Sequence, residues 1–248
     1  MITDIWFYCT AIPAVLVYGI GKGGFGGALG VIAVPLMALT TPPFQAASIL
    51  LPILIAMDVF AVRYHYKNCD YSEIKLMLPT AVLGIVVASF IMGVVTGEII
   101  QLFVGGISLL FCLQYYMKGN GKQTNKYAGR IWSFVSGISS TMIHAGGGPI
   151  SIYLLPKNLD KKVMVATMAV FFCIMNLIKL VPYTYFGQFD HQNLLTSLVL
   201  IPLAPVGVKL GIYLLQVISQ EQVYKICYLL LALSGGKLFY SGVMGLIA

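Results

Sequence analysis

The chain has 248 residues, of which 59% are hydrophobic and only 9% are charged. A soluble domain carries about 25% charged residues, and a core of this length still needs a polar surface. The composition therefore excludes a soluble enzyme, a DNA-binding module and a disordered regulator. It predicts an all-α polytopic membrane protein, because helices pair their backbone groups within lipid and the long apolar runs do not alternate as barrel strands do.

The formal net charge is +7 at neutral pH. In a soluble protein a basic balance is typical of nucleic-acid binding, but membrane proteins collect Lys and Arg in their cytoplasmic loops. We therefore expect the lipid bilayer, and no nucleic acid, as a partner. The five cysteines form no CxxC pair, so we expect no disulfide framework and no zinc site. No metal or other cofactor is predicted.

Apolar runs predict membrane segments along the chain. They lie near 5–20, 28–39, 43–64, 74–96, 98–117, 131–144, 149–155, 163–186, 193–216 and 222–246. Six of them have about 20 residues or more, enough for a helix to cross roughly 30 Å of hydrocarbon. The other four form two pairs, interrupted by the glycine clusters at 21–27 and 146–148. Each pair is therefore either a hairpin or one broken helix.

The positions of Lys and Arg favour the hairpins. With the N-terminus outside, hairpins place eleven loop charges on the cytoplasmic side: Arg63, Lys67, Lys75, Lys118, Lys122, Lys126, Arg130, Lys157, Lys161, Lys162 and Lys225. The predicted outer loops contain no Lys or Arg, as the positive-inside rule requires. Broken single spans would put four of these charges outside. We expect a multi-pass protein of the bacterial plasma (inner) membrane with both termini outside.

The two halves correspond to each other at an offset of about 120 residues. The matches are Gly26-Gly27 with Gly146-Gly147, Ala47-Ser48 with Ala166-Thr167, Asp70 with Asp190, and Gly84 with Gly207. Each half is a Gly-broken short-helix hairpin plus three transmembrane helices, and because three is odd the second half is predicted to be inverted. Two inverted repeats are typical of secondary transporters, and chance matching of abundant glycines is the alternative. We predict a first repeat at 1–117, a basic cytoplasmic linker at 118–130 and a second repeat at 131–248.

A helix is expected to begin after each glycine cluster, near Ala28 and Pro149. Glycine lets the backbone turn sharply and approach a ligand, and a helix N-terminus offers unpaired N–H groups and partial positive charge. Two such ends meeting from opposite sides predict an anion-binding cradle near the membrane midplane. Close helix packing through small residues is the alternative for any single glycine.

Ionisable residues within spans indicate function, because burying them in lipid is costly. Lys22, at the tip of the first hairpin, and Lys179, within a span, are candidate anion ligands. Asn176 shares a helix face with Lys179 and is a candidate donor to an oxyanion. Asp58 has two interpretations, as the ion-pair partner of one lysine or as a proton carrier.

His144 immediately precedes the second glycine cluster. It is either a satisfied packing residue or a residue that binds an anion or titrates near neutral pH. Lys237 lies near an outer span end and is expected to reach the headgroups, whereas the role of Lys209 stays open. No zinc spacing, Ser-His-Asp order or paired carboxylates indicate catalysis, so we do not expect an enzyme.

Both halves resemble one known family. GKGGFGGALGVIAVPLMAL followed by an Ala-Ser helix, and GISSTMIHAGGGPISIYLL followed by an Ala-Thr helix, are similar to the duplicated motif of the TauE/SafE sulfite exporter family. The resemblance implies a membrane carrier for small sulfur-containing anions, such as sulfite or sulfonates like sulfoacetate. His144 departs from the pattern, in which this position is often small or glycine. The residues that match the two motifs are Gly23, Gly24, Gly26, Gly27, Gly146, Gly147 and Gly148.

These observations predict a secondary transporter that exports a small sulfur-containing oxyanion by alternating access. Proton coupling through Asp58 and His144 is a hypothesis. The alternatives are an anion channel-like pore and a non-transporting membrane scaffold, and the buried lysines speak against the scaffold. Exposed small-residue faces also fit a homodimer, although the same residues serve internal packing. Export is the expected direction, although no residue fixes it, and the exact substrate and the coupling ion stay open.

Overall fold

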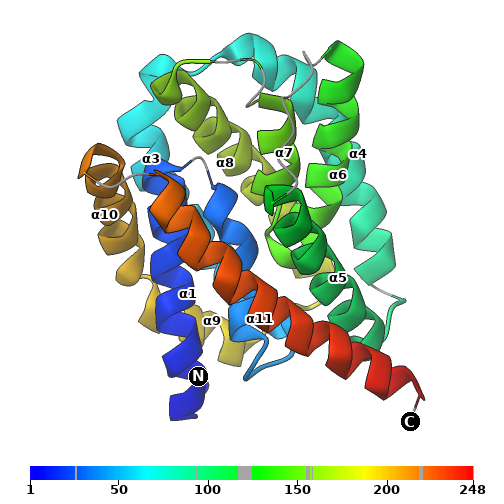
Figure 1. Cartoon of the computed structure of the whole chain (residues 1–248). Helices are drawn as coiled ribbons and strands as arrows, with labels where there is room; N and C mark the ends of the chain where they lie inside the picture. Colours follow the sequence, from blue (N-terminus) through cyan, green and yellow to red (C-terminus); the bar gives the residue numbers. More distant parts are fainter. Residues whose placement is uncertain are drawn as a thin grey trace.

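The computed structural model of the chain describes residues 1–25, 27–92, 94–116, 125–154, 157, 159–217 and 220–247. Within these ranges it consists of helices and connecting turns, without a strand (Figure 1). The first half contains α1 (Ile5–Gly24), η1 (Ala28–Ile32), α2 (Ala33–Met37), α3 (Pro43–His65), η2 (Tyr66–Asn68), α4 (Tyr71–Met92) and α5 (Gly97–Tyr116). The second half contains α6 (Lys126–Ile143), α7 (Gly147–Leu154), α8 (Lys161–Tyr185), α9 (His191–Leu200), α10 (Leu203–Val217) and α11 (Gln220–Ile247).

Four helices of the described residues are long and apolar enough to cross a membrane, and α9 with α10 gives a fifth if the bent pair is one span. The expected all-α membrane architecture is therefore confirmed. One of the four is α1, which the sequence predicts to end near residue 20. It continues to Gly24 because its glycines stay helical.

The single span expected at 193–216 is instead two helices that meet at an angle of 44°. Pro202 lies at the break, and Pro205 follows in the first turn of α10. Proline has no N–H for the helix and its ring clashes with the preceding turn, so a bend here has a local cause.

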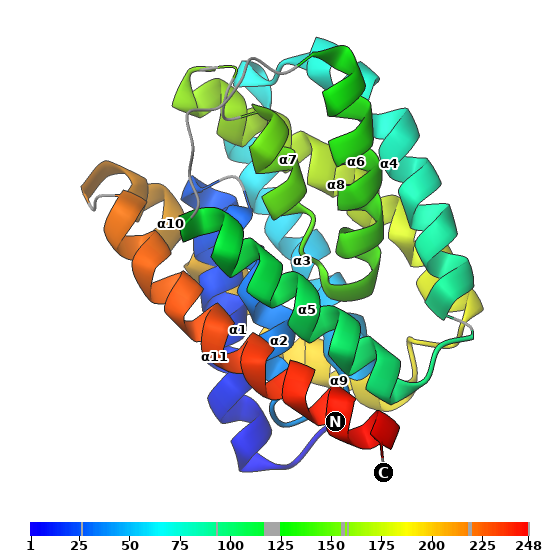
Figure 2. The same ribbon diagram turned by 45° about the vertical axis from the view of Figure 1, so that its right-hand side comes forward.

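The chain folds back at both glycine clusters. α1 lies against η1 and α2, and α6 lies against α7 (Figure 2). The second arm of the first hairpin is shorter than expected, since it consists of a 3-10 turn and the five-residue α2. The predicted helix start at Ala28 is thus a 3-10 helix, whereas α7 begins two residues before Pro149.

The remaining helices pack in long pairs. α1 lies against α10, α4 against α6, α3 against α8, and α5 against α11. Missing side chains allow the first two pairs to approach closely. A Cβ added to Gly19 of α1 would lie 2.8 Å from the Cα of Gly207, and one added to Gly137 of α6 would lie 2.2 Å from the carbonyl oxygen of Ala81. Both hairpins are thereby held against a helix of the other half.

Candidate functional site

Lys22 and Asp58 form a buried ion pair between α1 and α3. Lys22 is 5% exposed and Asp58 is 1% exposed. The Lys22 ammonium also donates to the carbonyl oxygen of Leu54 over 3.3 Å. Asn176 of α8 donates from Nδ2 to Asp58 Oδ2 over 2.6 Å, so both carboxylate oxygens have a donor. Such hydrogen bonds are what make a charge pair tolerable in a low-dielectric interior.

Lys179 and His144 form a second contact, between α8 and the turn of the second hairpin. The Lys179 Nζ lies 2.9 Å from His144 Nδ1, 3.1 Å from the Ser140 carbonyl oxygen and 3.1 Å from Ser140 Oγ. An ammonium has three donor hydrogens, so these acceptors use all of them. Lys179 is completely buried.

The hydrogen bonds assign the tautomer of His144. Its Nε2 lies 2.9 Å from the carbonyl oxygen of Ala47, which can only accept. Nε2 therefore carries the hydrogen, and Nδ1 accepts from Lys179. This arrangement makes His144 a neutral imidazole that bridges a lysine of α8 and the backbone of α3.

The backbone of His144 is left-handed, with φ of 54°, and ends α6. Among the described residues it is the only non-glycine with positive φ. This conformation favours glycine at helix ends, which accounts physically for the small residue that the family resemblance implies at this position. The carbonyl oxygen of His144 accepts from the Tyr18 hydroxyl over 2.9 Å, and its ring stacks on Tyr183 with centroids 6.1 Å apart. These contacts hold a strained residue in place.

The two contacts form one cluster through α8, because Asn176 and Lys179 lie three residues apart on one helix face. We define the anion cluster as Lys22, Asp58, His144, Asn176 and Lys179. With both lysines protonated it contains two ammonium groups, one carboxylate and a neutral imidazole. The surplus is one positive charge in an apolar interior, an arrangement that a bound anion stabilises.

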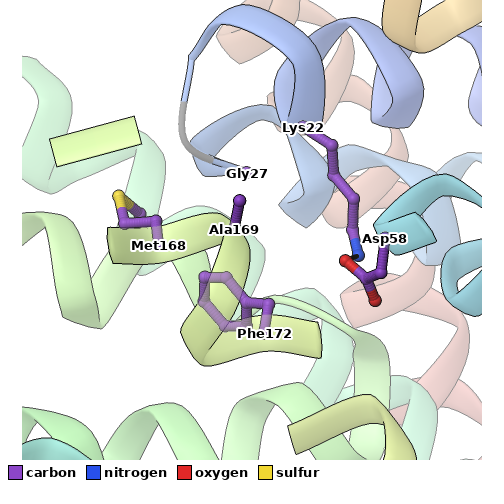
Figure 3. Close-up of a pocket in the computed structure, with 6 residues that line it drawn as sticks. All are labelled: Lys22, Gly27, Asp58, Met168, Ala169 and Phe172. Carbon is purple, nitrogen blue, oxygen red and sulfur yellow. Dashed lines mark hydrogen bonds and ion pairs between the residues drawn. The ribbon is translucent and has the colours of Figure 1, made fainter. Parts of the chain in front are cut away.

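A small pocket adjoins the cluster (Figure 3). Lys22 and Asp58 lie together on one side of this pocket, and residues of α8 and of the first hairpin turn lie on the other side. Phe172 of α8 lies between the two turns, since a Cβ at Gly27 would lie 3.6 Å from its ring and one at Gly146 would lie 2.8 Å from it. The lining residues are Lys22, Gly27, Asp58, Met168, Ala169 and Phe172.

The predicted glycines serve different purposes. Gly27 has φ of 76° and lines the pocket. Gly23 faces α10, where an added Cβ would lie 2.1 Å from the Val208 carbonyl oxygen, so helix packing accounts for it. Gly24 and Gly147 are buried at the ends of α1 and α7, while Gly148 is half-buried within α7.

Some expectations find no place in the anion cluster. Gly26 lies outside the described residues. Lys209 of α10 and Lys237 of α11 are exposed on the outer surface. The cradle of two α-helix N-termini is not formed as expected, because only the second glycine cluster leads directly into an α-helix. The described residues contain no group of three or more His, Cys, Asp or Glu suited to a metal.

Sequence reasoning missed several residues that support the cluster. Ser140 precedes His144 by four residues, and Tyr18 precedes Lys22 by four, so helical spacing offered a signal for both. Phe172 offered none, because an apolar residue in an apolar span is unremarkable by sequence. Tyr183, whose hydroxyl donates to the Thr141 carbonyl oxygen over 2.6 Å, likewise offered no signal in the sequence.

Comparison with known proteins identifies the family. The sequence model described as "Sulfite exporter TauE/SafE" matches residues 11–238, which include both glycine clusters and the whole anion cluster. No curated protein and no solved structure matches the chain. The family comprises membrane transporters of sulfite and related sulfur anions rather than enzymes. The resemblance seen in the two glycine motifs is thereby confirmed, and the chain belongs to the sulfite exporter TauE/SafE family as a multi-pass membrane protein.

Proposed function

We propose that the chain is a secondary transporter that exports small sulfur-containing oxyanions, such as sulfite or organosulfonates, across a bacterial plasma membrane. The observation that carries this proposal is the anion cluster, in which two buried lysines accompany a single acidic residue. Ionisable groups at membrane depth are costly and mark transport pathways. The excess of basic over acidic residues in this cluster suits an anionic substrate.

Lys22 is the residue that we assign to direct contact with the substrate. It lines the pocket. Among the described residues its ammonium has two acceptors, Leu54 and Asp58. The third hydrogen of the ammonium is thus available to an oxyanion in the pocket. Lys179 contributes positive charge without contacting the substrate, since its ammonium hydrogens are engaged by Ser140 and His144.

Alternating access around this site is the proposed mechanism, with the two halves as inverted repeats. The pairing of helices supports it: α1 packs on α10 as α6 packs on α4, while α3 and α8 pack on each other. The hydroxyl residues at matching positions of α3 and α8 each contact a segment of the other half, with opposite hydrogen-bond roles. Ser48 of α3 donates to Gln188 before α9, and Thr167 of α8 accepts from the Asp70 amide before α4. Rocking of one half against the other would open each side in turn.

The proposed orientation has both termini outside the cell, as the loop charges predict. A single cysteine added at Lys67, before α4, should then be labelled by a membrane-impermeant maleimide only after the cells are opened. Labelling of intact cells at this position would reverse the orientation. The native cysteines first need replacement by serine or alanine, with transport checked in that background.

Counterflow tests the function. Proteoliposomes loaded with unlabelled sulfite should accumulate labelled sulfite, because a carrier exchanges its substrate. The double variant Lys22→Met/Asp58→Asn removes both charges of the ion pair, so that neither residue is left without its partner, and should abolish accumulation. Lys209→Met, at an exposed lysine, is the matched control and should retain it. Sulfite flux without counterflow would indicate a channel-like pore, and folded wild-type protein without any flux of sulfite or sulfonates would favour a scaffold.

A further inference from the structure

We propose that the Asp58 carboxylate accepts, in the empty carrier, the hydrogen bonds of Lys22 and Asn176 that the substrate accepts in the loaded carrier. When a dianion displaces Asp58 from these donors, Asp58 takes up a proton. This inference rests on the proposed anion transport and deepens it. It names the charge class of the substrate, a dianion such as sulfite or a carboxylated sulfonate, and the residue that binds the accompanying proton.

The geometry of Asp58 is that of a bound oxyanion. One of its oxygens accepts from the Lys22 ammonium and the other from the Asn176 amide. Two neighbouring oxygens of a sulfite or sulfonate group can accept from the same two donors. The pocket beside Asp58 is lined by Lys22 as well, so an anion that accepts the remaining hydrogen of the Lys22 ammonium lies next to Asp58. By accepting from Lys22 and Asn176 in place of Asp58, this anion would compete with the carboxylate for the same donors.

Charge counting selects the dianion. With both lysines protonated and Asp58 ionised, the empty anion cluster sums to one positive charge. A dianion added to it leaves one negative charge, with the displaced carboxylate no longer paired. A proton that binds to this carboxylate forms an O–H bond and makes the occupied site neutral. Because an unpaired buried charge costs far more than a neutral acid, the proton should arrive with the dianion and leave with it.

The other ionisable groups near Asp58 are less suited to accept this proton. Lys179 already donates to three acceptors, and both ring nitrogens of His144 are occupied. Tyr18 of α1 and Cys173 of α8 interact electrostatically with Asp58, but neither is a base at neutral pH. The other buried histidine among the described residues is His65, two turns along α3, whose Nε2 lies 3.1 Å from the Gly23 carbonyl oxygen.

Calorimetry on the purified full chain tests the proposal. Sulfite is titrated in an alkaline solution in which it is fully dianionic, in two buffers of different ionisation enthalpy, so that the heat difference counts protons. Wild type should take up one proton for each sulfite bound, and Asp58→Asn should take up none. The variant should also bind sulfite about tenfold tighter or more, because no carboxylate competes for Lys22. Equal proton uptake by both proteins would overturn the proposal.

An infrared difference spectrum of wild type needs no variant and covers the case in which Asp58→Asn does not fold. Adding sulfite should produce the C=O band of a protonated carboxyl group and remove carboxylate bands. Sulfite counterflow without this band would refute the role of Asp58 while leaving the transport function intact. Absence of counterflow in folded wild type would instead refute the proposed sulfite transport itself.

Discussion

Lys179 donates to the Nδ1 of His144 over 2.9 Å, and this contact joins the middle of α8 to the turn of the second hairpin. The histidine occupies a backbone conformation that suits glycine, with φ of 54°. Its side chain is thus kept at a conformational cost. The conformational cost of the left-handed backbone and the contribution of the side-chain contacts can be measured separately.

Replacing His144 separates strain from side-chain contacts. His144→Ala and His144→Gly lose the same hydrogen bonds to Lys179 and Ala47, but only alanine retains a Cβ in the left-handed conformation. We expect His144→Gly to be more stable than His144→Ala by about 1 kcal/mol. Thermal unfolding of the purified variants in one detergent measures the difference. Equal stabilities would mean that the left-handed backbone is not retained in solution.

Asp58→Asn should impair net transport more than exchange. In the empty variant Lys22 has no carboxylate partner, and an unpaired buried ammonium disfavours the empty carrier. Exchange uses only loaded carriers, whereas net export needs the empty carrier to return. We therefore expect the ratio of sulfite counterflow to net sulfite efflux to rise above that of wild type. Lys237→Met, which changes an exposed lysine, should leave the ratio unaltered.

The contact between α4 and α6 should tolerate no extra carbon at Gly137. An added Cβ would lie 2.2 Å from the Ala81 carbonyl oxygen, which is backbone and cannot rotate away. We expect Gly137→Ala to lower stability by about 1–3 kcal/mol. Gly236→Ala is the matched control, since a Cβ added at this position of α11 would meet no atom within 4 Å, and it should be neutral or slightly stabilising. A fluorescence-based melting series compares the two.

Acid should weaken the start of α4. Asp70 caps this helix through the hydroxyl and amide of Ser72, and the Ser72 hydroxyl is the main cause that lowers the pKa of Asp70 below its ordinary value. A carboxyl group with a lowered folded-state pKa stabilises the fold above its unfolded pKa and loses this effect as the pH falls through the folded one. Asp70→Asn keeps a capping side chain without the titration. Its stability should therefore fall less than that of wild type on acidification, as measured by unfolding at a series of pH values.

The site was accessible to sequence reasoning where charge stood out against an apolar background. Lys22, Asp58 and Lys179 were recognisable because ionisable residues are rare within spans, and Asn176 because it is one turn from Lys179. Distances between helices are not encoded in that pattern, so the packing of Phe172 between Gly27 and Gly146 was not foreseeable. The bend between α9 and α10 could have been predicted, because Pro202 and Pro205 are visible in the sequence. The inverted relationship of the halves, the homodimer and the orientation stay predictions.

The glycine motif was informative as a cluster and ambiguous at single positions. Gly27 needs a left-handed backbone beside the pocket, while Gly23 needs room for the backbone of α10. Both demands select glycine, so the sequence alone does not separate a ligand role from packing. Gly19 and Gly207 likewise contact each other inside the chain. These glycines are therefore not free to form the face of a dimer.

In the proposed transporter, the complete hydrogen bonding of the Lys179 ammonium gives the two lysines different roles in anion recognition. With every hydrogen engaged by Ser140 and His144, Lys179 acts on a distant ion through its field alone. An electrostatic field distinguishes anions from cations but does not distinguish anions of different shape. Discrimination among tetrahedral, pyramidal and planar oxyanions then depends on the directional donors, Lys22 and Asn176. A variant altered only at Asn176 should consequently change which anions compete with one another, while still rejecting cations.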